Sequence, residues 1–190
     1  MVKTGLPFML EDKSGSLSGS DFVDLYDRMF LRVRCTRGPD GASRYRVYDM
    51  FAWHDIPVAT LEYGAAGTLG NITIIGPGAL SRTQPMAAFL VEVGGARHRK
   101  FIASDGQEYS WSWRTNTHED LEWSCTNANG HTVAWYVLKI PGEQYEDSSG
   151  CMFGVEEPYP HLATGQLMSE MVDFLATLLI MRHIATREGL

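Results

Sequence analysis

Arginine residues cluster in one short stretch of the chain. Between Arg28 and Arg46 the sequence has one acidic residue, Asp40, and six arginines: Arg28, Arg32, Arg34, Arg37, Arg44 and Arg46. A guanidinium group binds phosphate or carboxylate through two parallel hydrogen bonds, so such a cluster can recognise an anion. Four of these residues form the candidate anion-binding site: Arg32, Arg34, Arg44 and Arg46.

Two predicted strands present these four arginines. Arg32 and Arg34 alternate with apolar residues over Met29–Cys35, and the other two alternate in the same way over Arg44–Tyr48. Period-two alternation predicts strands whose successive side chains lie on opposite faces. If the pairing register places the two pairs side by side, four guanidinium groups share one surface, but the long connection leaves the register open. The alternative interpretation is a solvated strand face that acidic residues elsewhere balance.

Other polar clusters have weaker signatures. The basic run Arg97–Lys100 either lines the same rim or keeps a loop-to-strand junction soluble. The six histidines lack the i,i+2 or i,i+4 spacing of a local metal site, and the densest group of potential ligands, His118–Asp120, lies in a polar segment that predicts a turn. The sequence therefore predicts no metal and no cofactor.

No recognised nucleophile motif is present. The segment Gly15–Gly19 has Leu17 where the G-x-S-x-G motif needs its serine, and it predicts a Gly/Ser loop. Cys125 and Cys151 are either nucleophiles paired with a distant histidine or buried thiols. The catalytic residues, if any, stay unknown. The competing hypothesis is a small enzyme of the hydrolase, isomerase or cyclase type, whose barrel-mouth pocket is built from scattered His, Asp/Glu and Tyr.

The body of the chain has the pattern of a β-protein. Strand-like segments recur about every ten residues, which is typical of a sandwich or barrel. Asp105-Gly106 and Asn129-Gly130 are typical of tight hairpin turns. The further predicted strands are Val58–Tyr63, Asn71–Ile75, Ala87–Val93, Lys100–Ala103, Glu108–Trp113, Leu121–Cys125, His131–Lys139 and Cys151–Val155.

The C-terminal segment changes character and predicts a helix over about 166–186. Its residues are apolar nearly all round, which is typical of a buried helix. Asp173 lies in its middle, so we expect an arginine or backbone amides to partner this carboxylate. Tyr109, Trp111 and Trp113 share one strand face, which is either core packed on this helix or the wall of a ligand pocket.

The composition limits the classes of protein. The chain has 190 residues, 16 Lys+Arg against 23 Asp+Glu, a formal net charge of −7 and 44% hydrophobic residues. These values exclude a disordered chain and argue against general nucleic-acid binding. Five of the acids lie between Glu143 and Glu157, where there is no base. Without an apolar run of roughly 20 residues or a secretory leader pattern, we expect a cytoplasmic protein, peripheral to a membrane at most.

Three segments resemble a known superfamily: Phe101–Trp111, Val133–Tyr136 and Met168–His183, with Pro7-Phe8 and Val58–Tyr63 fitting more loosely. The chain resembles the tubby C-terminal superfamily, which includes LURP-one-related proteins and phospholipid scramblases, and within it is most similar to a fungal family. The resemblance implies a single domain over residues 1–190. It also implies a closed antiparallel barrel of about twelve strands around a buried C-terminal helix.

The same resemblance implies binding rather than catalysis. Tubby domains bind phosphoinositides through basic residues, whereas scramblases place their terminal helix in the membrane, for which this helix is too short. We therefore expect a non-enzymatic intracellular binding module. Its arginine-rich rim would recognise an anionic lipid head group or a protein partner.

Overall fold

The computed structural model describes residues 6–52, 55–76, 81–95, 97–115, 121–138, 148–156 and 164–189. Within them the chain forms thirteen strands, a long helix α2 (Thr164–Glu188), a short helix α1 (Met86–Phe89) and a 3-10 turn η1 (Ala65–Gly67). The strands are β1 (Phe8–Asp12), β2 (Gly19–Asp24), β3 (Phe30–Arg37), β4 (Ser43–Asp49), β5 (Ala59–Tyr63), β6 (Leu69–Ile75), β7 (Ser81–Pro85), β8 (Val91–Glu92), β9 (His98–Ile102), β10 (Glu108–Thr115), β11 (Leu121–Asn127), β12 (Thr132–Val137) and β13 (Cys151–Val155).

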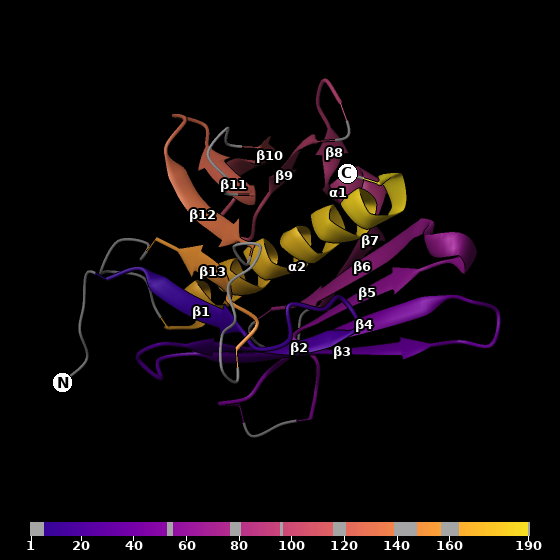
Figure 1. Cartoon of the computed structure of the whole chain (residues 1–190), viewed down its shortest axis with the longest axis horizontal. Coiled ribbons are helices and arrows are strands. Elements are labelled where there is room, and N and C mark those ends of the chain that lie inside the picture. The colour runs from indigo at the N-terminus through magenta and orange to yellow at the C-terminus, as the bar shows by residue number, and fades with distance from the viewer. Residues whose placement is uncertain are drawn as a thin grey trace.

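All thirteen strands belong to one antiparallel sheet in the order β7-β6-β5-β4-β3-β2-β1-β13-β12-β11-β10-β9-β8. Every pair of neighbours is consecutive in the chain except β1 and β13, where Leu10 lies opposite Phe153. Figure 1 shows the strands curving around α2, with β11 and β12 above the helix and β4 and β5 below it. The prediction of a mainly β fold with a C-terminal helix is confirmed.

The predicted closure of the barrel is not found as a hydrogen-bonded ladder. Among the described residues, the edge strands β7 and β8 pair only with β6 and β9 and not with each other. The chain instead crosses from β7 to β8 through α1. The predicted strand Ala87–Val93 is wrong over its first part, because α1 covers residues 87–89 and buries Met86 and Phe89, and only Val91–Glu92 form a strand, β8. A short apolar run does not distinguish a strand from a helical turn.

The two predicted hairpin turns are confirmed. Gly106 and Gly130 adopt φ values of 79° and 78°, and their N–H groups donate to the carbonyl groups of Ala103 and Asn127 at 3.0 Å and 2.9 Å. Glycine adopts such positive φ values without the steric cost that other residues incur. These turns therefore connect β9 to β10 and β11 to β12, the strands that hold the buried rings of Phe101, Trp111, Trp123 and Tyr136.

Helix α2 provides the centre of the core. Its residues from Met171 to Met181 are all buried, so apolar side chains face the sheet in every direction. The indole N–H of Trp111 donates to the hydroxyl of Thr177 at 2.8 Å, and the rings of Tyr109 and Phe174 meet edge to face with centroids 5.0 Å apart. The prediction that the aromatic face of β10 packs on the helix is confirmed. None of the helices in the described ranges combines the length and apolarity needed to cross a bilayer.

Candidate anion-binding site

The register of β3 and β4 brings the four candidate arginines to one face. Arg34 lies directly opposite Arg46, and Arg44 lies opposite Thr36. The residues that alternate with the arginines, Leu31, Val33, Tyr45 and Val47, are all buried against the core. Because successive side chains of a strand lie on opposite faces, Arg32, Arg34, Arg44 and Arg46 all leave the sheet on its outer face. We call this group the arginine face.

Asp21 on the neighbouring strand β2 engages two of these arginines. Arg32 donates from Nε and Nη2 to the two carboxylate oxygens of Asp21, each at 2.9 Å, and Nη1 of Arg34 donates to Oδ1 at 3.1 Å. These hydrogen bonds hold the pKa of the Asp21 carboxyl below its usual range and raise the pKa of Arg32. Asp21 was not among the residues that the sequence singled out, because β2 itself was not predicted.

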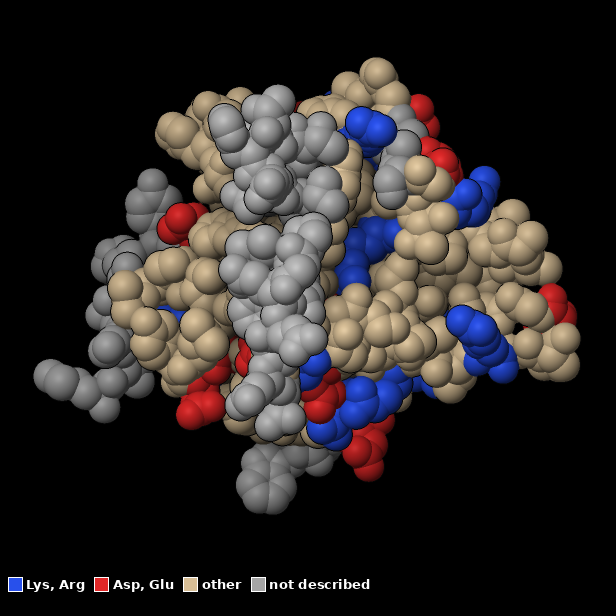
Figure 2. Space-filling model, viewed as in Figure 1, with Lys and Arg blue, Asp and Glu red and all other residues tan. Residues whose placement is uncertain are grey.

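The other two arginines differ in their surroundings. Arg44 pairs with Glu62 of β5 at 2.7 Å, and both side chains are about half exposed, so this pair adds little stability. Arg46 lies between Arg34 and Thr60 and forms no ion pair within the described part of the chain. Figure 2 shows the wider surface, on which Lys and Arg are scattered and several have Asp or Glu beside them. The arginine face is thus partly balanced by acids, with Arg46 as its least compensated member.

A cavity of about 530 Å³ opens at the end of the arginine face. It lies between the β3–β4 hairpin and the start of β6, and its lining includes Arg37, Arg44, Glu62 and Tyr63. Burial raises the pKa of the Tyr63 phenol well above its usual value, so this hydroxyl resists ionisation even at alkaline pH. Among the described residues, the lining of the cavity offers two guanidinium groups to a ligand but no thiol and no histidine.

The second basic cluster does not join the arginine face. Arg99 of β9 is buried on the inner face and pairs with Glu92 at 3.1 Å, whereas Lys100 lies on the opposite face and pairs with Glu108 at 3.0 Å. In the sheet order, seven strands separate β9 from β4. The run Arg97–Lys100 is therefore divided between two faces of an ordinary strand.

The remaining candidates give no catalytic or metal site in the described residues. Cys125 and Cys151 are buried, and burial raises the pKa of the Cys125 thiol well above its usual value, which makes it a poor nucleophile. No group of three potential metal ligands forms within the described ranges. Several of the predicted polar residues lie outside those ranges: His54, His118, Glu119, Asp120, Glu143, Glu146, Asp147, Glu157 and His161.

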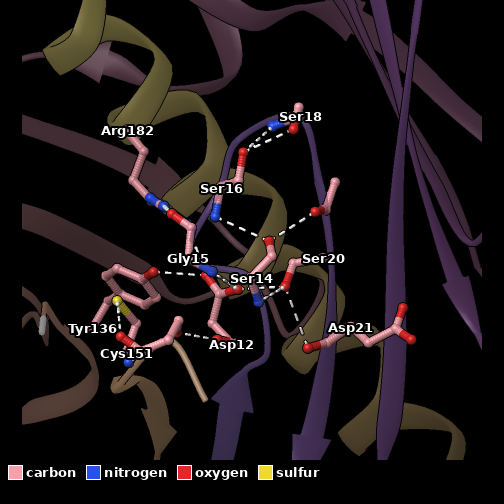
Figure 3. Close-up of polar contacts among 12 residues, drawn as sticks. Asp12, Ser14, Gly15, Ser16, Ser18, Ser20, Asp21, Tyr136, Cys151 and Arg182 are labelled. Carbon is pink, nitrogen blue, oxygen red and sulfur yellow. Dashed lines mark hydrogen bonds and ion pairs between the residues drawn. The ribbon is translucent and has the colours of Figure 1, made fainter. Parts of the chain in front are cut away.

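A buried ionic cluster joins β1, β12 and α2 (Figure 3). The Asp12 carboxylate accepts hydrogen bonds from the Tyr136 hydroxyl at 2.7 Å, the Gly15 N–H at 2.9 Å and Arg182 Nη1 at 3.2 Å, and the Ser20 hydroxyl also donates to it. Arg182 Nη2 donates to the Gly15 carbonyl at 2.8 Å. Asp12 is fully buried, so this Asp12 cluster fixes the predicted Gly/Ser loop against the helix and is closed to a ligand.

Asp173 has a backbone amide as its partner, which is one of the two alternatives expected from the sequence. The Ser104 N–H donates to its Oδ2 at 2.6 Å, whereas its Oδ1 has no hydrogen-bond partner among the described residues. Burial raises the pKa of this carboxyl, an effect that nearby Arg82 opposes and Asp105 reinforces. The folded protein therefore binds the Asp173 proton more tightly than the unfolded chain does.

This raised pKa predicts a pH dependence of stability. The free energy of unfolding falls as the pH rises from the unfolded-state pKa of about 4 through the higher folded-state pKa. Asp173→Asn removes this dependence and raises stability at pH 7 by roughly 1–3 kcal/mol, because no charge is then buried. Urea unfolding of both proteins across this pH range measures the difference. An Asn variant that is less stable at pH 7 contradicts the prediction.

No family model, curated protein or solved structure matches this chain. The relation to the tubby superfamily therefore stays a prediction from the sequence.

Proposed function

We propose that this protein is a non-enzymatic binding module that recognises an anionic lipid head group through Arg32, Arg34, Arg44 and Arg46. The observation that supports the proposal best is the direct pairing of Arg34 with Arg46 on the outer face, with no acid assigned to Arg46 among the described residues. Like charges directly opposite each other on a sheet repel, so a phosphate between them relieves this repulsion. The resemblance to tubby domains supports a lipid head group over other anions.

The ion pairs of the arginine face do not prevent such binding. Exposed ion pairs contribute about 0–1 kcal/mol each, so exchanging a carboxylate for a phosphate costs little. Asp21 holds the guanidinium groups of Arg32 and Arg34 beside each other on one side of the Arg34–Arg46 pair. A doubly charged phosphate monoester accepts more bidentate hydrogen bonds than the single carboxylate it replaces.

Removal of the Arg34 and Arg46 side chains tests this proposal. In co-sedimentation with phosphatidylcholine vesicles that contain a phosphoinositide, Arg34→Ala/Arg46→Ala is expected to weaken binding about tenfold or more, since each charge-assisted contact contributes about 1.5–3 kcal/mol. Lys13→Ala/Lys100→Ala is the matched control, because it removes two exposed positive charges elsewhere on the surface. This control is expected to bind nearly as the wild-type protein does.

Three results contradict the proposal. The first is that the wild-type protein fails to bind the vesicles, and the second is that the arginine variant binds them as the wild-type protein does. The third is that the arginine variant and the lysine control lose affinity equally, because the effect then comes from net charge alone. Binding to the arginine face is also expected to weaken steeply with added salt. A soluble inositol phosphate, measured by calorimetry, separates head-group recognition from binding to the vesicle surface.

A further inference from the structure

Exposed apolar residues gather in two loops at one end of the sheet. Leu25 and Tyr26 lie in the β2–β3 turn, and Met50, Phe51 and Ile56 lie in the connection from β4 to β5. Leu25, Phe51 and Ile56 are 58%, 52% and 60% exposed. Isolated exposed apolar residues are normal on a protein surface, but a contiguous group marks an interaction site. We call these five residues the apolar end.

The two loops lie side by side. β2 and β4 both pair antiparallel to β3, so both strands finish at the same end of the sheet. The Met50 N–H donates to the Phe30 carbonyl at 2.9 Å, which joins the start of the second loop to the strand that leaves the first. The apolar end is therefore one surface, although it comes from two separate parts of the chain.

The apolar end is continuous with the arginine face. Phe30 is two residues from Arg32, and Met50 is four residues from Arg46. Because residues an even number of positions apart on a strand share a face, all four side chains project from the outer face. At about 3.3 Å per residue, Arg32 lies ~7 Å from Phe30 along its strand and Arg46 lies ~13 Å from Met50. The guanidinium group of Arg32 also lies over the Phe30 ring, 5.2 Å from its centroid. The outer face thus passes from apolar side chains to cations within a few residues.

This spacing matches the chemistry of a bilayer surface. Interfacial protein segments bury apolar side chains about 5–10 Å into the boundary between head groups and acyl chains. With the apolar end at that boundary, the arginines lie at the level of the lipid phosphates. Tyr26 and Phe51 add aromatic rings, which are enriched at this depth. A soluble anion would engage the arginines but would leave the apolar end in water.

The acidic residues of these two loops limit how deeply the apolar end can enter a membrane. Asp27 and Asp55 are exposed beside the apolar side chains, and Asp49 accepts the Phe51 N–H at 2.9 Å. Carboxylates near an anionic membrane are repelled by it and are costly to place in the hydrocarbon region. The apolar end would therefore insert shallowly, in the interfacial layer.

We propose that the apolar end inserts into the interfacial layer of an anionic membrane while the arginine face binds the phosphates above it. This proposal rests on the proposed function and adds the orientation of the protein on the bilayer. It also requires that vesicles bind more tightly than the same head group does in solution.

The experiment compares two triple variants. Leu25→Gln/Phe51→Gln/Ile56→Gln removes the apolar end, and Val91→Gln/Val93→Gln/Ile102→Gln is the matched control. Its residues lie on β8, directly after β8 and on β9, and they are 42%, 39% and 56% exposed. All six positions are exposed, and circular dichroism checks that both variants fold. The probes are phosphatidylcholine vesicles with a phosphoinositide and, separately, the soluble inositol phosphate.

The apolar-end variant is expected to bind vesicles about tenfold more weakly or worse. Its affinity for the soluble inositol phosphate is expected to stay within about twofold of wild type, because the arginines are intact. The β8–β9 control is expected to match the wild-type protein in both assays. Asp27→Asn/Asp55→Asn is expected to strengthen vesicle binding, since it removes repulsion at the membrane.

Each failure has a distinct meaning. If the apolar-end variant binds vesicles as wild type does, the insertion proposal is overturned while the arginine face stands as the binding site. If both triple variants weaken equally, the effect is not specific to this end and the proposal fails. If the wild-type protein binds neither vesicles nor the inositol phosphate, the proposed function itself fails.

Discussion

Asp12→Ala is expected to lower the free energy of unfolding by about 3–5 kcal/mol, because it leaves the Arg182 guanidinium buried without its counter-charge. Arg182 is 8% exposed and Asp12 is fully buried, so water does not replace the lost carboxylate. The same change removes the acceptor of the Tyr136 hydroxyl and of the Gly15 N–H. Urea denaturation, with the transition midpoint and its slope, measures the loss.

Two companion variants show where this energy arises. Tyr136→Phe removes one neutral donor and is expected to cost only about 1 kcal/mol. Asp12→Leu/Arg182→Met removes both charges and is expected to recover part of the loss, since no charge is then buried unpaired while the Tyr136 hydroxyl and the Gly15 N–H still lack their acceptor. An Asp12→Ala protein no less stable than Tyr136→Phe would show that Arg182 finds other partners, and the prediction would be wrong.

Trp111→Ala is expected to destabilise the protein by a similar amount, about 3–5 kcal/mol. Trp111 is fully buried between β10 and α2, and close packing around the helix leaves no neighbour free to fill the space. The variant also removes the donor to the Thr177 hydroxyl. Thermal and chemical unfolding both report this change, and thermal unfolding is expected to show a lower midpoint.

A second tryptophan provides the matched control. Trp135 lies on the outer face of β12, half-buried, with its indole over Gly154 of β13. Trp135→Ala is expected to cost clearly less than Trp111→Ala, because part of this side chain is already in water. Equal losses in the two variants would contradict the assignment of Trp111 to the centre of the core. Thr177→Val isolates the hydrogen bond and is expected to cost about 1–3 kcal/mol.

Local sequence patterns predicted most of the sheet correctly. Alternation predicted β3 and β4, the Asp-Gly and Asn-Gly turns predicted two hairpins, and the predicted strand Cys151–Val155 has the observed bounds. The helix expected over about 166–186 extends over Thr164–Glu188. The strands have apolar faces, the two turns have explicit Asp-Gly and Asn-Gly residues, and α2 is apolar nearly all round, so the pattern of a few residues determines the local structure.

Three strands were missed for identifiable reasons. β1 and β2 each end in a buried aspartate, Asp12 and Asp24, whose charge hides the alternation; their partners, Arg182 and Arg28, lie outside the strands. β7 is the polar sequence Ser81–Pro85, an edge strand that ends in proline. Buried charges are read as surface residues when their partners lie outside the strand.

The candidate site was predicted only in part. Alternation placed Arg32 with Arg34, and Arg44 with Arg46, on one face of each strand. The structure adds the register, which brings the two pairs to the same face and sets Arg34 opposite Arg46. The role of Asp21 and the cavity beside Arg44 depend on tertiary pairing, which a single sequence does not specify. The apolar end likewise becomes one surface only when β2 and β4 are aligned on β3.

The one strand pair that is not consecutive in the chain has a consequence for how the protein folds. The strands from β2 to β7 and from β9 to β12 can pair as hairpins through contacts that are close in sequence. In contrast, β1 meets β13 only by closing a loop of about 140 residues. Such distant contacts slow folding, because the entropy of closure is lost before they form. Helix α2 follows the thirteen described strands, so a growing chain exposes the apolar side of its sheet until this helix is made. We therefore expect this protein to fold cooperatively only after α2 has been synthesised, with α2 and the β1–β13 pair completing the core together.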